Sequence, residues 1–240
     1  MLKVEQVSAG YGKLQILSDI SVVAKPTDIT VVVGPNGSGK STLLKTIAGL
    51  TSIYSGSVEF DGKRISGMKP YEIARDGLAY LPQTEAVFTQ LKVSENLKMA
   101  GYTVEQDQFE PRIRETLSIF PKVSEFMEKK VVQLSGGERQ MVAMMMALVR
   151  KPKVVMFDEP TANLAPKIAT QVLETIKSLA KGMGLTVLLV EQNARRALEM
   201  GDRAYLLVGG KSVYEGTASE LLGQKELARM YLGLKVEQNA

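Results

Sequence analysis

Short apolar runs alternate along the chain with longer segments whose apolar residues recur at helical spacing. A continuous run of β-branched and aliphatic residues is typical of a strand covered on both faces. Such runs predict strands at Ile29–Val33, Leu78–Leu81, Val154–Phe157, Leu185–Val190 and Ala204–Val208. The segments between them predict helices at Thr42–Gly49, Pro166–Lys181 and Ala194–Met200. This alternation indicates an α/β fold with a largely parallel sheet and helices on both faces.

Other parts of the chain show shorter strands joined by tight turns. Strands are predicted at Leu2–Val7, Ile20–Ala24, Ser57–Phe60 and Ser212–Tyr214. Turns are predicted where glycine follows a polar residue, a tyrosine or another glycine, at Tyr11–Gly12, Asp61–Gly62 and Gly209–Gly210.

Residues 86–150 differ from the rest because they contain few β-branched runs. Their apolar residues recur at helical spacing, for example at Ile113, Leu117 and Phe120, and prolines predict breaks at Pro111 and Pro121. We therefore expect one domain over residues 1–240, in which residues 1–85 and 151–240 form the core and residues 86–150 form a helical insert.

Composition narrows the chemistry. The chain has 240 residues and contains no cysteine, histidine or tryptophan, which excludes thiol catalysis, His-based triads and Cys or His zinc sites. Any metal chemistry must then use oxygen ligands, which points to magnesium or calcium. The net charge of +4 is scattered, so a solvated surface is favoured over a nucleic-acid-binding face, while a weak attraction to an acidic membrane stays open.

No apolar run reaches the ~18 residues that a membrane-spanning helix needs. The longest run, Met141–Val149, has nine residues, and the N-terminal segment does not read as a signal peptide. We therefore expect a cytoplasmic protein whose membrane role, if it has one, comes through a partner.

A glycine-rich segment follows the predicted strand Ile29–Val33 and precedes a predicted helix. It matches the pattern G-x-x-x-x-G-K-[ST], in which backbone N–H groups and the helix N-terminus surround phosphates. The alternative, a glycine-rich turn that matches by chance, is disfavoured because the strand and helix stand where the motif requires them. The candidate phosphate-binding residues are Gly34, Pro35, Asn36, Gly37, Ser38, Gly39, Lys40, Ser41 and Thr42.

Two carboxylates stand at the end of the strand Val154–Phe157. Asp158 and Glu159 would be costly at the end of a buried strand unless a cation or water meets them there. Asp158 is predicted to hold Mg²⁺ and Glu159 to activate an attacking water. Alone, these residues could equally cap a neighbouring helix; beside the glycine-rich loop, the catalytic role is favoured.

A third motif, Leu134–Glu138, precedes an apolar helix. Ser135 and Glu138 are spaced as a capping box, which makes Ser135 the predicted N-cap, and Gly136 and Gly137 expose backbone amides that can bind an anion. A plain capped helix is the ordinary alternative.

These three motifs, in this order, resemble the ATP-binding cassette (ABC) ATPases, and the resemblance covers essentially the whole chain. It implies a P-loop NTPase fold with a mostly parallel core sheet, an antiparallel β subdomain and a helical subdomain. It also implies a head-to-tail pair of cassettes, in which each ATP lies between the Walker A loop of one chain and the signature residues of the other. The implied signature residues are Ser135, Gly136, Gly137 and Glu138.

The resemblance assigns further roles to matching residues. Tyr11 is similar to the aromatic residue that stacks on adenine, although it could be an ordinary turn tyrosine. Gln83 is similar to the glutamine that senses Mg²⁺ and the attacking water and that leads to the surface docking on a membrane partner; a solvated loop glutamine is the alternative. The implied metal ligands are Ser41, Gln83 and Asp158, and the implied catalytic residues are Glu159, Gln192 and Lys40.

Finer features resemble the LivF-type group, the ATPase subunits of branched-chain amino acid importers. They lie at Val87–Phe88, Leu91–Leu97, Leu164–Pro166, Val190–Arg195 and Tyr231–Gly233. The implied function is hydrolysis of ATP, with Mg²⁺, to power uptake of branched-chain or other hydrophobic amino acids. The implied partners are permease subunits, a second ATPase subunit and, indirectly, a solute-binding protein; the implied location is the inner face of the membrane. An importer of another small solute stays open.

Two positions depart from the wider family. Most members have histidine at the position of Gln192; the LivF-type group resembles this chain in having glutamine, which donates and accepts hydrogen bonds but does not become charged. Many members have an acidic residue at the position of Ala165, so its absence puts communication between the two sites in doubt. A methionine cluster at Met141 and 144–146 favours flexible core filling over a binding surface.

Three other classes fit less well. A DNA-repair ABC protein would need a long coiled-coil or zinc-bearing insert, whereas residues 86–150 are short and lack Cys and His. A translation-associated ABC protein would need two cassettes. A small-molecule kinase would leave Leu134–Glu138 and Gln192 without a purpose.

Overall fold

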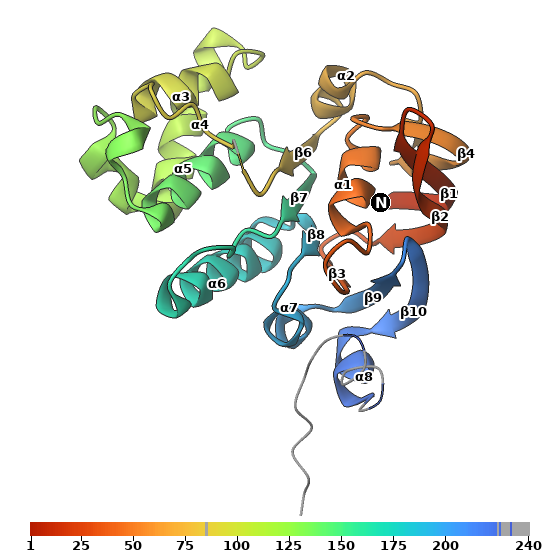
Figure 1. The fold of residues 1–240 in the computed structure, drawn as a ribbon. Coiled ribbons are helices and arrows are strands. Elements are labelled where there is room, and N and C mark those ends of the chain that lie inside the picture. The colour runs from red at the N-terminus through yellow and green to blue at the C-terminus, as the bar shows by residue number, and fades with distance from the viewer. Residues whose placement is uncertain (85, 225, 227–230, 232–240) are drawn as a thin grey trace, which may run out of the picture.

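The computed structural model of the chain describes residues 1–84, 86–224, 226 and 231. It contains a six-stranded sheet in the order β10-β9-β3-β8-β7-β6 and a four-stranded sheet in the order β2-β1-β4-β5. Figure 1 shows the larger sheet in the middle of the molecule, with β1, β2 and β4 on one side and helices α3, α4 and α5 on the other. The strands of the larger sheet are β3 (Ile29–Val33), β6 (Leu78–Leu81), β7 (Val154–Asp158), β8 (Thr186–Val190), β9 (Arg203–Val208) and β10 (Lys211–Thr217).

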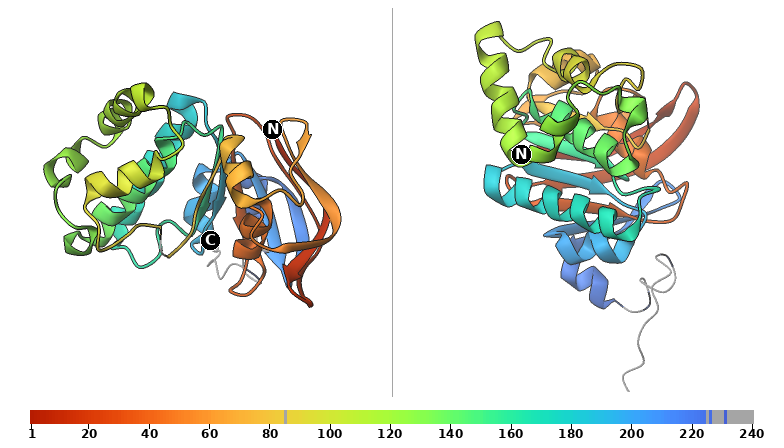
Figure 2. Two further views of the ribbon diagram at one scale, coloured as in Figure 1. Left: turned by 90° about the horizontal axis from the view of Figure 1, so that it is seen from above. Right: turned by 90° about the vertical axis from the view of Figure 1, so that its left-hand side faces the viewer.

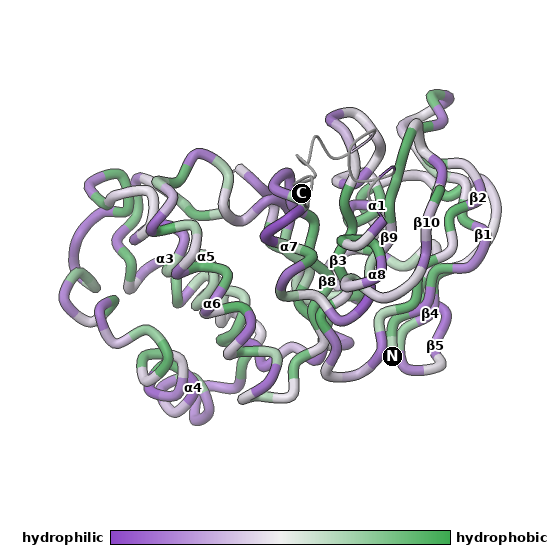
Figure 3. The backbone as a smooth tube through the Cα atoms, turned by 90° about the horizontal axis from the view of Figure 1, so that it is seen from below, coloured by the Kyte–Doolittle hydropathy of each residue, from purple (hydrophilic) through white to green (hydrophobic). Residues whose placement is uncertain are grey.

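The larger sheet is parallel except at one edge. β9, β3, β8, β7 and β6 pair in parallel, and only β10 pairs antiparallel with its neighbour β9. The predicted strands in this sheet are confirmed to within one or two residues, except that the last, predicted at Ser212–Tyr214, runs over Lys211–Thr217. β3, β7 and β8 are buried along their whole length, as the continuous apolar runs indicate, and β3 and β8 lie in the hydrophobic parts of the tube in Figure 3.

Alternate residues of the five parallel strands enter two separate hydrophobic cores. Val31 and Leu189 belong to the core shared with α5 (Gly136–Leu148), α6 (Pro166–Met183) and α7 (Ala194–Met200). Val32 and Leu188 belong to the core shared with α1 (Lys40–Ile47) and the antiparallel sheet. Helices α5, α6 and α7 therefore cover one face of the larger sheet. The other face is covered by α1, the short helix α2 (Pro70–Arg75) and the second sheet (Figure 2).

The antiparallel sheet is more extensive than the short predicted strands. It is formed by β1 (Leu2–Tyr11), β2 (Leu14–Ala24), β4 (Ser52–Phe60) and β5 (Lys63–Arg64). Register shifts interrupt the β1–β2 pairing and break the two-residue alternation on which the prediction depended. The predicted turn at Asp61–Gly62 is confirmed, since both residues have positive φ, as a tight hairpin between β4 and β5 requires.

The regular elements of residues 93–148 are helices: α3 (Val93–Ala100), α4 (Gln106–Ile119), two short 3-10 helices (Pro121–Phe126 and Val131–Gln133) and α5. The predicted break at Pro121 is confirmed, but the break at Pro111 is wrong, because α4 continues through it. Pro111 removes one backbone hydrogen bond on the exposed side of α4. The helix continues because Ile113 and Thr116 are buried on its inner face.

Two of the four methionines of α5 fill the interior, as predicted, whereas Met146 also lines an apolar groove. Met144 and Met145 are fully buried, and Met141 and Met146 are packed against the same core. Two short helices, α2 and α8 (Ala218–Gly223), were not predicted. In the ranges that the structure describes, no helix has both the length and the hydropathy to cross a membrane.

Candidate functional site

The loop between β3 and α1 needs glycine for steric reasons. Gly34 has a φ of 152°, and a Cβ there would lie 2.1 Å from the carbonyl oxygen of Leu207. Gly39, the N-cap of α1, has a φ of 99°, and a Cβ there would lie 2.7 Å from the side chain of Leu17. The backbone therefore closes into a turn that side chains would block.

Anion-binding groups converge on this loop. The N-terminus of α1 directs backbone N–H groups toward it. Among the described residues, the buried Ser38 Oγ has no hydrogen-bond partner, and burying such a group is costly unless a ligand uses it. These features suit a phosphate group.

Lys40 places a buried positive charge in the same place. Its side chain is 4% exposed, and Nζ donates to the carbonyl oxygens of Gly34 at 2.9 Å and Pro35 at 3.0 Å. Burial lowers the pKa of Lys40, while the neighbouring carboxylates of Glu159 and Asp158 oppose that shift. A further negative charge at the loop would offset the burial of this cation.

Asp158, at the end of β7, is held by two hydroxyl groups. Its Oδ1 accepts from Ser41 Oγ at 2.8 Å, and its Oδ2 accepts from the Tyr80 hydroxyl at 3.0 Å. Burial, followed by the charge of Asp158, raises the pKa of Tyr80, so the hydroxyl stays protonated and donates. Sequence reasoning paired Asp158 with Ser41 as metal ligands but missed Tyr80.

Glu159 adopts a strained backbone. Its φ is 49°, in the left-handed region that costs about 1–2 kcal/mol for a residue with a Cβ. Its N–H donates to the carbonyl oxygen of Val190 at 2.9 Å, which holds this conformation. The carboxylate accepts from Gln83 Nε2 at 3.1 Å and lies 4.0 Å from Lys40 Nζ. Strain of this kind is found at functional sites.

Most of the predicted nucleotide-site residues line one cavity of about 490 Å³. It combines the loop after β3 with single residues that follow β6, β7 and β8, and with one residue of β2 that was not predicted, Ile16. The lining residues are Ile16, Asn36, Gly37, Ser38, Gly39, Lys40, Ser41, Thr42, Gln83, Glu159 and Gln192. Asp158 lies directly behind this cavity through Ser41.

Other predicted residues lie elsewhere. Tyr11 is 43% exposed at the end of β1 and is not among the lining residues, so its contact with adenine stays a prediction. The motif Leu134–Glu138 lies at the start of α5, on the helical side of the molecule (Figure 2). Within the described residues, none of this motif lines the cavity at the glycine-rich loop of its own chain.

The predicted capping box at Ser135 is confirmed. Ser135 N–H donates to Glu138 Oε2 at 2.9 Å, and Ser135 Oγ accepts from the Glu138 N–H at 3.4 Å. The bonds that the Ser135 N–H and the Ser135 hydroxyl donate to Glu138 Oε2 hold the pKa of Glu138 below its usual range. A Cβ on Gly137 would lie 2.7 Å from Ile168 of α6, so glycine also permits α5 to pack against α6.

A second cavity of about 540 Å³ shares Glu159 and Gln192 with the first. Thr161, Asn163 and Glu191 also line it, and Ala165 caps α6 beside it without a side-chain hydrogen bond.

Glu191 was not predicted, although it precedes Gln192. It is 2% exposed, and its Oε1 accepts from the Thr161 N–H at 3.1 Å. Burial raises the pKa of Glu191. Glu191 thus ties the loop after Glu159 to the segment that carries Gln192.

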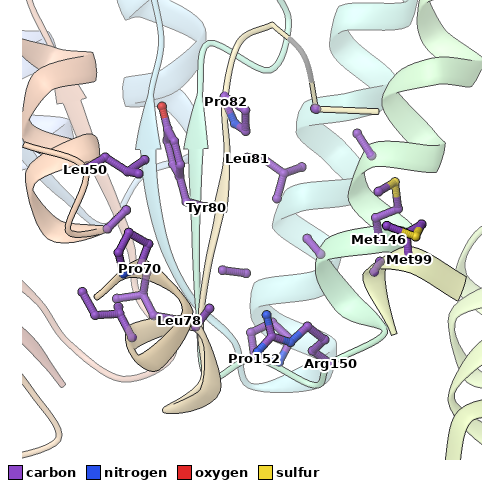
Figure 4. A pocket seen from close by; sticks show the side chains of 18 residues that line it. Leu50, Pro70, Leu78, Tyr80, Leu81, Pro82, Met99, Met146, Arg150 and Pro152 are labelled. Atoms are coloured by element: carbon purple, nitrogen blue, oxygen red, sulfur yellow. The ribbon is translucent and has the colours of Figure 1, made fainter. Parts of the chain in front are cut away.

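A third, apolar groove of about 390 Å³ lies along β6. One wall carries Leu50 and Pro70, the other carries Met99 and Met146, and Arg150 stands at one end (Figure 4). Tyr80 and Pro82 of the intervening segment also line it, so the groove begins next to Gln83.

A metal at this site would have few protein ligands. In the described part of the chain, no group of three or more acidic side chains is gathered to hold a metal ion. One carboxylate, Asp158, and the Ser41 hydroxyl are adjacent. This sparse oxygen set suits Mg²⁺, which takes one or two carboxylates together with substrate phosphates.

Comparison with known proteins gives consistent matches. A family model described as ABC transporter matches residues 17–162. The chain is 50% identical over 234 residues to the probable branched-chain amino acid transport ATP-binding protein LivF of Archaeoglobus fulgidus, with 98% of this chain and 99% of that protein covered. It is 41% identical over 233 residues to the high-affinity branched-chain amino acid transport ATP-binding protein BraG of Pseudomonas aeruginosa, with 97% and 100% covered.

A solved dimeric ATP-binding cassette, described as a post-hydrolysis state bound to ADP and Pi, aligns with a TM-score of 0.79. The sequence identity is 26%, and the alignment covers 91% of this chain and 99% of that chain. Of the LivF-type features, Leu232 and Gly233 lie outside the described residues.

The burial of Glu191 predicts a pH-dependent effect on stability. Because its pKa is raised in the folded state, the folded chain binds the proton more tightly, and wild-type stability is lost as pH rises above the ordinary glutamate pKa. Glu191→Gln keeps an acceptor for the Thr161 N–H without the charge. We expect this variant to gain stability relative to wild type as pH rises from 5 to 8, measured by urea unfolding.

Glu220→Gln is a control that should lose stability relative to wild type as pH rises, the opposite of the effect expected for Glu191→Gln. Hydrogen bonds from Thr217 lower the pKa of Glu220, so that carboxylate contributes stability at high pH, and its contribution is lost as pH falls. A Glu191→Gln curve that runs parallel to wild type would contradict the prediction.

Proposed function

The chain belongs to the ABC transporter family, and from this premise we propose that it is the ATP-hydrolysing subunit of an importer for branched-chain or other hydrophobic amino acids. One observation carries the proposal: the glycine-rich loop, Glu159, Gln83 and Gln192 line a single cavity. The near full-length identity to LivF of Archaeoglobus fulgidus supports the substrate class.

ATP binding is assigned to the loop Gly34–Thr42. Its backbone N–H groups and the α1 N-terminus surround the phosphates, while Lys40 reaches the outer phosphates as a point charge. Lys40 is already held in place by the Gly34 and Pro35 carbonyl oxygens. Tyr11 is the proposed adenine contact.

Ser41, Asp158 and Gln83 are the proposed holders of Mg²⁺. Ser41 and Asp158 already lie within hydrogen-bond distance of each other, which supports this assignment. Mg²⁺ neutralises charge on the β- and γ-phosphates when it is bound.

Glu159 is the proposed general base. Its hydrogen bond with Gln83 and its backbone bond to Val190 orient the carboxylate toward the loop. A carboxylate in this position orients a water and accepts its proton as the water oxygen bonds to the γ-phosphorus and the bond from that phosphorus to the leaving oxygen of ADP breaks. Gln192, which lines the same cavity, donates a hydrogen bond to that phosphate through its amide.

Two cassettes are proposed to close over the nucleotide. The motif at Ser135, Gly136 and Gly137 does not line the cavity of its own chain, although its amides form a helix N-terminus that suits an anion. In a head-to-tail pair, this motif contacts the γ-phosphate held by the other chain, and Glu138 fixes Ser135 for that contact. Closure then excludes bulk water, and loss of the γ-phosphate after hydrolysis reopens the pair.

The apolar groove along β6 is the proposed docking site for a permease segment on the inner face of the membrane. The groove lies between the core and helices α3 and α5 and begins beside Gln83, so an occupant contacts both parts and lies next to the catalytic site. Residues 86–150 are proposed to act as the helical subdomain that transmits closure. A solute-binding protein acts indirectly through the permease.

Uptake tests the proposed function directly. This chain, co-expressed with its permease and partner ATPase and reconstituted into vesicles, is expected to drive ATP-dependent leucine uptake. Glu159→Gln should abolish uptake while the complex still assembles. Retained uptake in the Glu159→Gln complex would refute the proposed role of Glu159. No uptake of any branched-chain or other hydrophobic amino acid by the wild-type complex would refute the proposed transport function.

Glu159→Gln also tests the paired arrangement. Without the base, turnover should fall roughly 100-fold or more, and ATP should accumulate in a stable dimer. Size-exclusion chromatography with Mg²⁺·ATP should show that dimer, whereas the matched variant Lys40→Ala should bind nucleotide weakly and stay monomeric. A monomeric Glu159→Gln chain with ATP bound argues against the pair.

Gln192 gives the ATPase a particular pH dependence. Because glutamine does not titrate, the wild-type rate should show no step near pH 6.5 from this position, and Gln192→His should introduce one at about that pH. ATPase rates from pH 5.5 to 8.5 check this. Coincident profiles for the two proteins would show that residue 192 does not act on the phosphate.

A further inference from the structure

Tyr80 belongs to two sites at once. Its side chain lines the apolar groove, and its hydroxyl donates to Asp158 Oδ2 at 3.0 Å. Figure 4 shows Tyr80 and Leu81 pointing to opposite sides of β6, as strand alternation requires. Tyr80 is therefore a single side chain between the groove and the carboxylate behind the glycine-rich loop.

The register of β6 against β7 explains this contact. Tyr80 pairs with Met156, so Asp158 lies two residues further along the neighbouring strand, on the same face. Because Ser41 occupies Oδ1 and Tyr80 occupies Oδ2, the carboxylate plane is fixed from both sides. Asp158 is 3% exposed, and a hydrogen bond to a charged group is stronger away from water.

We infer that Tyr80 is a positioning residue, which fixes Asp158 for metal ligation and makes that orientation depend on what fills the apolar groove. The inference rests on the proposed role of Asp158 in holding Mg²⁺ and on the proposed docking of a permease segment. A segment that presses on the ring of Tyr80 shifts its hydroxyl, and Asp158 Oδ2 shifts or loses its donor. Occupancy of the groove is thereby communicated to the metal end of the site through one hydrogen bond.

A purely structural role for Tyr80 makes a different prediction. If the ring only fills space, Tyr80→Phe should leave the Mg²⁺ requirement for nucleotide binding unchanged, because phenylalanine retains the ring and loses only the hydroxyl. The chain offers a matched control in Tyr205, a buried tyrosine whose hydroxyl donates to the Glu215 carboxylate at 3.0 Å, between β9 and β10. Tyr205→Phe removes the same type of bond away from the nucleotide cavity, together with the acceptor for the Val23 N–H, so it is the more severe of the two changes.

The first test measures binding of a fluorescent ATP analogue by the full chain over a range of Mg²⁺ concentrations and in EDTA. Tyr80→Phe should raise the Mg²⁺ concentration for half-maximal binding about tenfold, because a hydrogen bond to a charged group is lost. Its affinity in EDTA should stay at the wild-type value, and Tyr205→Phe should change neither quantity. An unchanged Mg²⁺ requirement in Tyr80→Phe would overturn the inference.

Asp158→Asn separates this inference from the proposed function. If Asp158→Asn does not raise the Mg²⁺ requirement, the proposed metal role of Asp158 is wrong. If Asp158→Asn raises it and Tyr80→Phe does not, the metal role holds and only the inference about Tyr80 fails.

The second test fills the groove. Because the chain has no cysteine, Leu50→Cys creates a single labelling site on a groove residue that is 49% exposed, and Val213→Cys creates a control site that is 45% exposed on β10. A bulky maleimide on Leu50→Cys should raise the Mg²⁺ requirement about threefold, and the label on Val213→Cys should not.

Combining the label with Tyr80→Phe measures the coupling itself. The effect of the Leu50→Cys label should disappear when Tyr80 is phenylalanine, because the hydroxyl that carries it is absent. An equal effect of the label with and without the hydroxyl would show that the groove acts on the metal site by another route.

Discussion

The site depends on the parallel direction of the central strands. Because β3, β8, β7 and β6 run the same way, their carboxyl ends meet at one edge of the sheet. The glycine-rich loop follows β3, Glu159 follows β7, Gln192 follows β8 and Gln83 follows β6. Four segments that are distant in sequence thus line one cavity, and the cavity would not form if one of these strands were reversed.

Electrostatics then decides what this edge can hold. Lys40 and Asp158 are nearly fully buried, and their charges are satisfied by the Gly34 and Pro35 carbonyl oxygens and by the Ser41 and Tyr80 hydroxyl groups. Burying such charged groups is costly unless they are fully paired. A polyphosphate supplies negative charge to Lys40, and a divalent cation supplies positive charge to Asp158. The carboxylate of the strained Glu159 lies 4.0 Å from Lys40 Nζ.

Two parts of the chain outside the nucleotide cavity are proposed to contact partner proteins. On one side, Ser135, Gly136 and Gly137 form a helix N-terminus that does not line the cavity of its own chain and that we propose contacts a second cassette. On the other side, the groove along β6 shares Tyr80 with the carboxylate Asp158. The proposed nucleotide site and the proposed docking groove thereby share the side chain of Tyr80.

Sequence patterns predict the strands of the central sheet, the loop Gly34–Ser41, the capping box at Ser135 and the hairpin at Asp61–Gly62. These depend on residues a few positions apart, so burial patterns and capping spacing suffice to predict them. The tertiary structure alone decided that Tyr80 reaches Asp158 and that Glu191 holds Thr161, because both contacts depend on which strands are neighbours and in which register. It also decided that α4 continues through Pro111, since burial of the inner face of α4 outweighs the loss of one backbone hydrogen bond. Local motifs can be predicted from residues that are close in sequence, whereas contacts between distant segments can be predicted only when the order and register of the strands are known.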